Sequence, residues 1–456
     1  MAKNIVINEF STALVQKKGA IFIGAGISVP SGFKSWVELL REMQEDIDLE
    51  IDDHLDLTEV AQFIVNNNLN NKGRILNKIV ECYTTTDGIY SNKYHKVLAQ
   101  MNVMTIWTTN YDTLLEESFR HVSTVIRRCD TDLLPIVDID QKIEIIKMHG
   151  SVDSPSPENL VITKEDYEDY FYTHPLTTER LKNDLLNKSF LFIGYSYRDS
   201  NIRSIMTQIR QLCSRGTRTH YMVVEKEKNV NSYKLQKLWA KDLERFGIKT
   251  YIYENADQSH RELLEIMESI AQKSKGNTLF VTGSHTVEES AFLEELGVEL
   301  ARIKNLTLIN GQSKGVANIV LKSFIDECLN LGQSVQNRIE IYANPCAHNE
   351  DWETKEEYGA LLESFKYRLV RQTQIMIVLP GSYGTKAEIE KAKQLGTIII
   401  PIITEDRNEL IDELLENINI VERLKIFSPS LYHSLKNEQL TTVDEVIECV
   451  KNILAV

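Results

Sequence analysis

The sequence has few cysteines, and none of them stands in a metal-binding pattern. Its six cysteines are scattered along 456 residues, and no Cys-x-x-Cys pair occurs. Structural zinc sites and disulfide frameworks both depend on closely spaced or regularly paired cysteines. We therefore expect no metal and no disulfide scaffold.

Positive charge is also scarce. Lysine and arginine total 51 against 66 aspartates and glutamates, a formal net charge of −15. Phosphate backbones are bound by basic surfaces, so we expect no nucleic-acid partner, whereas local basic pockets for a nucleotide remain open. No apolar run is long enough to cross a bilayer, and the first residues carry no signal-peptide core. We expect no membrane association and a cytoplasmic location.

The composition that remains is that of a globular protein, with 42% hydrophobic and 26% charged residues. The length exceeds one ordinary core and predicts two or three domains. Short apolar strands alternate with helical segments, which is typical of parallel sheets. The polar segment 271–277 interrupts this alternation, so we place a first domain at residues 1–274 and a second at 277–456. The predicted fold class is α/β, with two Rossmann-like parallel-sheet domains and a helical insertion in the first at about residues 46–100.

Three predicted strands of the first domain end in residues that can carry chemistry. Residues 20–23 lead into Gly-Ala-Gly-Ile-Ser at 24–28, residues 104–107 lead into Thr-Thr-Asn-Tyr-Asp at 108–112, and residues 143–148 lead into His149. Ligands collect at the carboxyl ends of parallel strands, so we expect one composite pocket. Glycines in the first turn would let backbone N–H groups approach a diphosphate.

Each of these residues also has a structural interpretation. His149 suits a general base because imidazole ordinarily titrates near neutrality, but it can equally be a satisfied strand-end histidine. The carboxamide of Asn110 suits the positioning of a hydroxyl group. Asp112 and Asp199 can simply cap the helices that follow them. The glycine pair alone is no more than a tight turn.

Taken together, these motifs resemble the sirtuin (SIR2) family over roughly the first 270 residues. The family's Gly-Ala-Gly-x-Ser loop, Thr-Gln-Asn-x-Asp signature (with threonine in place of glutamine) and His-Gly pair stand at 24–28, 108–112 and 149–150. The resemblance implies that NAD+ is bound, with Asn110 and His149 as the catalytic residues. The residues it assigns to the dinucleotide are Gly24, Ala25, Gly26, Ser28, Phe33, Asp112, Gly194, Ser196 and Asp199.

Protein-deacylating sirtuins carry a four-cysteine zinc module, which this sequence lacks. We therefore interpret the chemistry as NAD+ hydrolysis, with water in place of an acylated lysine. Cleavage of the nicotinamide glycosidic bond passes through an oxocarbenium-like state, and nicotinamide leaves as a neutral molecule. A protein deacylase and a non-catalytic nucleotide-sensing scaffold are the alternatives.

The second domain contains a glycine-rich turn between a strand and a helix, Pro-Gly-Ser-Tyr-Gly-Thr-Lys-Ala-Glu at 380–388. A helix N-terminus of this kind favours anions, although it would also favour Glu388 as a simple helix-end carboxylate. The turn resembles the Pro-Gly-Gly-x-Gly-Thr-x-x-Glu signature of the SLOG superfamily, with Ser382 in place of a glycine. Enzymes of that superfamily pair the glutamate with an upstream arginine, for which Arg371 is the first candidate and Arg368 and Lys366 are the others.

Because the signature is altered, we interpret this domain as a binding site and not as a second enzyme. The predicted activator-binding residues are Gly283, Ser284, Arg371, Gly381, Ser382, Gly384, Thr385 and Glu388.

A SIR2-like domain followed by a SLOG domain is similar to the effector family of the Thoeris anti-phage system, over essentially the whole chain. The resemblance implies that a cyclic ADP-ribose isomer, made by a TIR-domain partner, binds the SLOG domain and switches on NAD+ hydrolysis in abortive infection. It also implies a homo-tetramer that assembles further into filaments.

Overall fold

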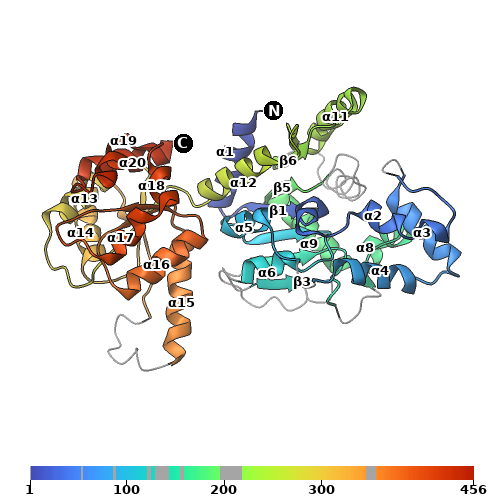
Figure 1. Ribbon diagram of the computed structural model, residues 1–456, viewed down its shortest axis with the longest axis horizontal. Helices are drawn as coiled ribbons and strands as arrows, with labels where there is room; N and C mark the ends of the chain where they lie inside the picture. The colour runs from blue at the N-terminus through green and yellow to red at the C-terminus, as the bar shows by residue number, and fades with distance from the viewer. Residues whose placement is uncertain are drawn as a thin grey trace. The chain divides into compact units, whose positions relative to one another are not determined.

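The computed structural model describes residues 2–52, 55–85, 89–120, 125–128, 143–154, 159–195, 218–345 and 356–455 (Figure 1). The chain divides into two compact units, Met1–Ser274 and Lys275–Val456. Each unit contains one sheet, and all the strand pairs described in both sheets are parallel. The predicted fold class is confirmed.

The sheet of the first unit has seven strands in the order β3-β4-β2-β1-β5-β6-β7. The strands are β1 (Gly19–Ile23), β2 (Thr105–Thr108), β3 (Val125–Arg128), β4 (Ile143–Lys147), β5 (Ser189–Ile193), β6 (His220–Glu225) and β7 (Ile248–Tyr253). β1 and β5 are buried along their whole length, as expected of central strands covered on both faces. The chain turns to opposite sides of β1 in its two halves, and ligands bind at such a reversal in open α/β sheets.

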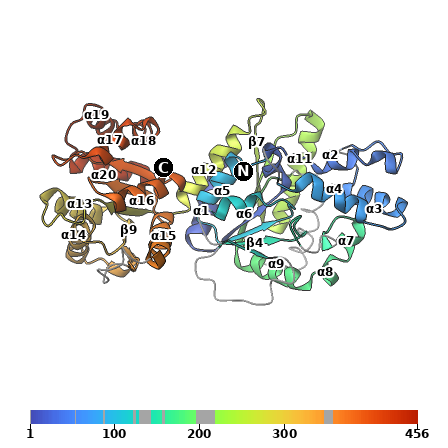
Figure 2. The ribbon, with the colours of Figure 1, turned by 60° about the horizontal axis from the view of Figure 1, so that its bottom comes forward.

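Helices cover both faces of this sheet. On one face lie α1 (Lys3–Val15), α5 (Lys93–Gln100), α6 (Leu114–Arg120) and α12 (Arg261–Lys273), which pack on one another and on the strands. On the other face, a hydrophobic cluster joins the strands to the segment of α7 (Lys164–Glu168), α8 (Tyr170–Thr173), α9 (Pro175–Asn187) and α11 (Val230–Leu243). In Figure 2, α7, α8 and α9 follow one another along one side of the unit.

The predicted helical insertion between the first two strands is present. Its bounds differ from the predicted 46–100. It contains α2 (Trp36–Arg41), η3 (Gln44–Asp46), α3 (Leu57–Asn67) and α4 (Gly73–Tyr83), whereas α5, at the end of the predicted range, packs with α6 and α12. Its apolar side chains form a second hydrophobic cluster with Leu114, Val152 and Ile162, which follow β2 and β4. The insertion therefore packs directly on the segments that leave the carboxyl ends of those strands.

One predicted strand in this unit was wrong, and one strand was not predicted. Residues 160–162 are buried as predicted but form irregular extended chain, in which the Val161 N–H donates to the His149 carbonyl at 3.2 Å. The segment thus packs on the loop after β4 without joining the sheet. The edge strand β3 was not predicted. The predicted capping box at Thr163 and Asp166, which opens α7, is confirmed.

The second unit has a five-stranded sheet in the order β10-β9-β8-β11-β12. Its strands are β8 (Thr278–Thr282), β9 (Thr307–Asn310), β10 (Ile339–Ile341), β11 (Ile375–Val378) and β12 (Ile398–Pro401). Its helices are α13 (Ala291–Arg302), α14 (Val316–Asn330), α15 (Glu356–Arg371), α16 (Tyr383–Gln394), α17 (Glu409–Glu416), α18 (Ile418–Leu424), α19 (Pro429–Lys436) and α20 (Val443–Ala455). α14 packs on β8 and β9, while α16, α17 and α18 pack on β12.

Candidate functional site

The strand register brings the predicted motifs of the first unit to one edge. Ile23 pairs with Thr108 of β2, and Thr108 in turn pairs with Lys147 of β4. Asn110 and His149 each lie two residues beyond these paired positions, and the glycine turn begins directly after Ile23. The predicted convergence of three strand ends is therefore confirmed, with β1 in the middle of the carboxyl edge.

The glycine turn after β1 is packed against the turn after β5. A Cβ atom placed on Gly24 would lie 2.5 Å from the Gly194 carbonyl oxygen, and one on Gly26 would lie 2.9 Å from it. Gly194 has φ +77°, and its own Cβ would lie 2.6 Å from the Gly24 carbonyl. These glycines are thus required for the close approach of two turns.

This packing corrects the predicted role of the glycine amides. The Gly24 N–H donates to the Ile193 carbonyl at 2.9 Å and the Gly26 N–H to the Gly194 carbonyl at 3.0 Å. The Ser28 N–H bonds back within the turn to the Ala25 carbonyl. The Ala25 amide, on an exposed residue, has no such bond among the described residues and remains available to a ligand.

Asn110 joins β2 to this turn. The residue is 4% exposed, and its Nδ2 donates to the Ser28 Oγ at 3.1 Å and approaches the Gly24 carbonyl at 3.4 Å. Its backbone N–H donates to the Thr108 Oγ1, which fixes the turn from within. The Oδ1 atom is buried and has no hydrogen-bond partner among the described residues. Buried acceptors are normally paired, so this orphan is the expected mark of a ligand position.

Asp112 caps the helix that follows it, which is one of the two roles considered for it from the sequence. Its Oδ1 accepts the N–H of Leu114 at 3.0 Å, at the start of α6. The same turn is held from below by Lys147, whose Nζ donates to the carbonyls of Tyr111 and Asp112 and pairs with Glu116 Oε1 at 3.2 Å. The turn that presents Asn110 therefore rests on a buried ion pair.

His149 lies in an aromatic surrounding at the end of β4. Its Nδ1 is 3.5 Å from the Tyr167 hydroxyl, and the two rings meet edge to face with centroids 5.2 Å apart. The ring centroids of Tyr111 and Tyr170 are each 6.4 Å away. No described residue forms a hydrogen bond with Nε2, so this atom is the one available to water or a substrate hydroxyl.

The expectation of a near-neutral His149 was wrong. Burial, reinforced by nearby His174 and opposed by Asp166, lowers the pKa of His149 from its ordinary value near 6.5 to about 3. The imidazole is therefore neutral throughout the physiological range. It can accept a hydrogen bond at all such pH values, but it is a weaker proton acceptor than an exposed histidine.

Three buried histidines of the first unit predict a loss of stability in mild acid. Burial lowers the pKa of His95 and His220 to about 4 and that of His149 to about 3. The unfolded chain takes up these protons near pH 6.5 and the folded chain does not, so stability falls as the pH drops below 6.5. Urea unfolding at pH 7.5 and 5.5 should show a loss of a few kcal/mol, because each histidine costs about 1.4 kcal/mol for each pH unit below 6.5. An unchanged unfolding midpoint would contradict the buried neutral state.

The remaining predicted residues of the first unit are placed differently. Phe33 is buried under the insertion, with its ring 5.8 Å from that of Tyr83, and Tyr83 in turn lies 5.8 Å from Tyr111. Phe33 thus supports the wall beside His149 through two intervening rings. Ser196 and Asp199 lie outside the described residues.

A cavity that the sequence did not predict opens beside the glycine turns. It has a volume of about 700 Å³ and extends from Gly26 and Gly194 to the carboxyl ends of β6 and β7. The acidic and basic residues at 225–228 and Tyr253 line its far part. The sequence feature that could have predicted this cavity is the charged tetrapeptide at 225–228, which directly follows the buried run 221–224.

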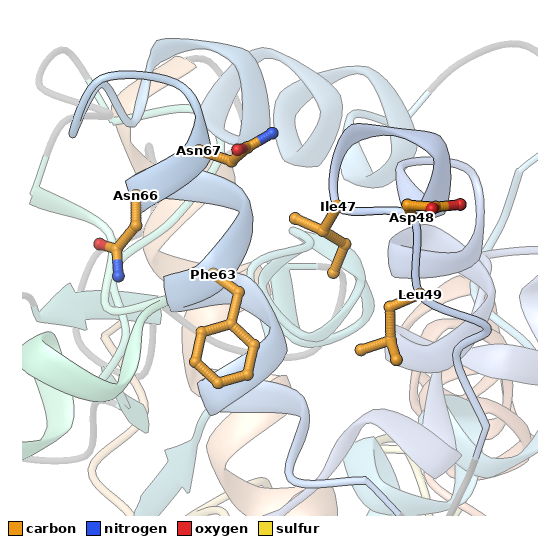
Figure 3. A pocket seen from close by; sticks show the side chains of 6 residues that line it. All are labelled: Ile47, Asp48, Leu49, Phe63, Asn66 and Asn67. Carbon is orange, nitrogen blue, oxygen red and sulfur yellow. The ribbon is translucent and has the colours of Figure 1, made fainter.

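A second hollow lies on the insertion (Figure 3). It has a volume of about 510 Å³ between η3 and α3, and the side chains of Phe63 and Leu49 project toward it. Its lining contains one carboxylate, two asparagine amides and three apolar side chains. These six side chains include no nucleophile, and the one carboxylate among them is not in contact with another reactive group.

In the second unit, most of the predicted activator-binding residues meet at the carboxyl edge of β8 and β11. The Ser284 N–H donates to the Pro380 carbonyl at 2.9 Å, and the Thr385 Oγ1 donates to the Gly283 carbonyl at 3.3 Å. A Cβ on Gly381 would lie 2.3 Å from the Thr385 Oγ1, so glycine is required there. The two turns form one continuous surface.

Glu388 faces this surface from the second turn of α16. Its Oε2 accepts the hydroxyl of Thr282 at 2.5 Å. Burial raises the pKa of Glu388, while Thr282 and the charge of Lys366 act in the opposite direction. The Lys366 Nζ donates to the Gly384 carbonyl at 3.3 Å, which places a basic residue at this edge.

The placement of Arg371 with these residues was wrong. Arg371 ends α15 and lies ahead of β11, at the amino end of the strand, whereas Gly381 and Ser382 follow its carboxyl end. Its guanidinium is buried beside the Tyr367 ring and contributes to the lowered pKa of Lys275. Arg368 is exposed and lies near Tyr342; burial and Glu340 raise the pKa of Tyr342, and the Arg368 charge opposes that shift.

The turn between β9 and α14, at residues 311–315, was not predicted. Gly315 has φ +71°, and a Cβ there would lie 2.3 Å from the Ser284 carbonyl. The Val316 N–H donates to the same carbonyl at 3.1 Å. The turn therefore joins the surface formed by the other two, and the glycines at 311 and 315 before an apolar helix were the signal that could have found it.

The described ranges were searched for metal sites and membrane spans. They contain no group of three or more histidine, cysteine, aspartate or glutamate side chains arranged to hold a metal ion. They also contain no helix that combines the length and apolarity needed to span a bilayer.

The sequence comparisons agree with the two folds. A family model described as "SIR2-like domain" matches residues 104–246, and one described as "Sir2- and TIR-associating SLOG family" matches residues 262–456. The fold and these matches thus define a protein of the SIR2–SLOG class, with a SIR2-like unit followed by a SLOG unit.

Whole-chain comparisons narrow the assignment further. Three relatives named NAD(+) hydrolase ThsA are each 30% identical to this chain. The Enterococcus faecium protein matches over 100% of this chain and 98% of its own length, that of Acinetobacter baumannii (strain 532279) over 88% and 87%, and that of Bacillus cereus (strain MSX-D12) over 85% and 82%. The chain belongs to the ThsA family.

Proposed function

We propose that this chain hydrolyses NAD+ to nicotinamide and ADP-ribose. The observation that carries the proposal is the buried carboxamide of Asn110, held by Ser28 through Nδ2 and left unpaired at Oδ1, on the same sheet edge as His149. Membership of the ThsA family supports the same reaction, since the three relatives compared are named NAD(+) hydrolases.

The two residues have different tasks in this proposal. Cleavage of the glycosidic bond develops positive charge on the ribose, and the leaving nicotinamide needs no proton. Neutral His149 accepts a hydrogen bond from the attacking water, or from a ribose hydroxyl, at Nε2. Asn110 orients the nicotinamide ribose or the water through Oδ1. The exposed Ala25 amide and the Ser28 side chain lie where the diphosphate and its ribose would pass.

We further propose that the second unit binds a cyclic ADP-ribose isomer that activates hydrolysis. The N-termini of α14 and α16 open at the edge formed by the 283–284, 311–315 and 380–382 turns, and helix N-termini favour phosphate. Lys366 adds a positive charge there. In this proposal a TIR-domain partner makes the nucleotide, and the activated chain, a cytoplasmic homo-tetramer that extends into filaments, depletes NAD+ in anti-phage abortive infection.

The experiment is a mass balance on NAD+. The full chain is incubated with NAD+, with and without a cyclic ADP-ribose isomer, and nicotinamide and ADP-ribose are quantified. Equal release of the two products, increased by the isomer and independent of any acylated peptide, is the expected result. If NAD+ stays intact under all conditions, the chain is not a hydrolase, and a nucleotide-sensing scaffold is the interpretation that remains. Products that appear only with an acylated peptide would indicate a deacylase.

Replacing Lys366 by methionine should raise the activator concentration needed for half-maximal hydrolysis about tenfold, the usual effect of losing one charge-assisted hydrogen bond. The NAD+ concentration for half-maximal rate should not change. Lys393→Met, on the last turn of α16 and paired with Glu390, is the matched control. Equal activator responses of the two variants would remove Lys366 from the site.

A further inference from the structure

The cavity beside the glycine turns lies on the opposite side of β1 from the proposed reaction centre. Asn110 and His149 follow β2 and β4, whereas the cavity runs over the ends of β5, β6 and β7. A ligand whose middle lies at the 24–26 turn and whose reactive end lies at Asn110 must place its other end in this cavity. If the proposed NAD+ chemistry holds, that other end is the adenosine half.

The dimensions agree with this placement. Neighbouring strands are spaced by about 4.8 Å, so the ends of β6 lie about 10 Å from β1, which is the scale of a nucleoside. The volume of about 700 Å³ is within the range of small-ligand sites. The rings of Tyr94 and Tyr253 and the side chain of Leu263 contribute apolar parts of its lining.

Glu225 presents a held carboxylate to this cavity. It is the last residue of β6, and its backbone carbonyl accepts the Gln236 amide at 2.6 Å. One carboxylate oxygen, Oε1, accepts the Asn255 Nδ2 at 2.9 Å. Asn255 is itself fixed, because its Oδ1 accepts the His260 N–H at 2.9 Å. The other oxygen, Oε2, has no hydrogen bond among the described residues, and the His260 ring is 4.0 Å away.

The neighbouring positive charges do not cancel Glu225. The Lys226 ammonium is paired with Glu254 at 2.6 Å. Lys228 is exposed on the rim of the cavity and has no described partner. The carboxylate of Glu225 is therefore the fixed charge at the strand end, and Lys228 is a movable one farther out.

We propose that Glu225 binds the 2′-hydroxyl of the adenosine ribose and makes this enzyme specific for NAD+ over NADP+. A carboxylate is an acceptor only, and a ribose hydroxyl can donate to it. In NADP+ that hydroxyl carries a phosphate, which has a charge of about −1.5 to −2 and no comparable donor. It would meet Glu225 as one anion meets another. A carboxylate after a strand end has the same role in other dinucleotide folds.

The test measures binding and turnover separately. Calorimetry on the full chain with His149→Ala, in which turnover is expected to stop, should show NAD+ binding at least about thirtyfold more tightly than NADP+. Adding Glu225→Gln should weaken NAD+ binding about tenfold and reduce the preference to a few-fold at most, since hydrogen bonds to charged groups have this scale. Glu268→Gln, an exposed acid of α12 that does not line the cavity, is the matched control.

In hydrolysis assays of the chain with His149 intact, Glu225→Gln should raise KM for NAD+ with little change in kcat, because the contact is remote from the broken bond. Glu225→Asp keeps the charge and should still reject NADP+. This second variant keeps the proposal testable if Glu225→Gln folds poorly. Equal binding of NAD+ and NADP+ by the parent, or an unchanged preference in Glu225→Gln, would overturn the proposal. A Glu225-dependent binding preference without any hydrolysis would support it while refuting the proposed function.

Discussion

Replacing Asn110 by alanine should reduce NAD+ hydrolysis about 10²–10⁴-fold, the range found when an orienting or proton-transfer group is removed from an active site. The carboxamide has one atom committed to the protein, the Nδ2 on Ser28 and Gly24, and one atom that is buried and unpaired, the Oδ1. The side chain is thus positioned for a partner that the folded chain does not itself supply.

The fold should survive this change. Loss of the carboxamide removes one 3.1 Å hydrogen bond and one weaker 3.4 Å contact, at a cost of about 1–2 kcal/mol. The far-ultraviolet spectrum should be unchanged. Asn187→Ala, on the exposed side of α9, removes the same group away from the site and should retain full activity. His149→Ala should lose activity on the same scale as Asn110→Ala. Retained turnover in either variant would move the reaction centre elsewhere.

Replacing Lys147 by methionine should destabilise the first unit by about 3–5 kcal/mol, the cost of leaving a buried charge without its partner. Lys147 and Glu116 are 2% and 3% exposed, and the Glu116 Oε2 has no hydrogen bond among the described residues even in the native chain. The substitution also removes the donor to the carbonyls of Tyr111 and Asp112, so the turn carrying Asn110 loses its support.

A double substitution tests whether the unpaired charge of Glu116 causes this loss of stability. Lys147→Met combined with Glu116→Leu removes both charges and should recover part of the lost stability, because an apolar pair of similar size can replace a buried ion pair. Lys182→Met breaks a surface pair with Glu179 and should cost no more than about 1 kcal/mol. Urea unfolding followed by fluorescence measures all three variants. A Lys147→Met variant no less stable than Lys182→Met would mean that the pair is not buried in solution.

Much of the fold was predictable because its signals are local. The runs at β1, β2 and β5 are short and contain no charged residue, β4 is apolar apart from Glu144 and Lys147, and the ends of these strands are marked by glycine, asparagine or histidine. Because parallel strands share a carboxyl edge, this alone brings the Asn110 and His149 segments together. Residues 160–162 have the same apolar character without pairing, since they fill a core position beside the insertion.

The details of the site depend on contacts between distant segments. The pKa of His149 is lowered mainly by burial, and the three rings around it come from two other parts of the chain, which no local pattern reveals. Gly24 and Gly26 are needed for their approach to Gly194, which is about 170 residues away in the sequence. Arg371 is a different case. Its place before β11, and not after it, already assigns it to the other edge of the sheet.

The direct measurement is a crystal structure of the full chain with His149→Ala and bound NAD+. The nicotinamide ribose should lie against the Oδ1 of Asn110, the diphosphate beside the Ala25 amide, and the adenosine in the cavity at the ends of β6 and β7. NAD+ bound anywhere else, or an Asn110 Oδ1 that remains without a contact to the dinucleotide, would contradict a reaction centre built from these strand ends.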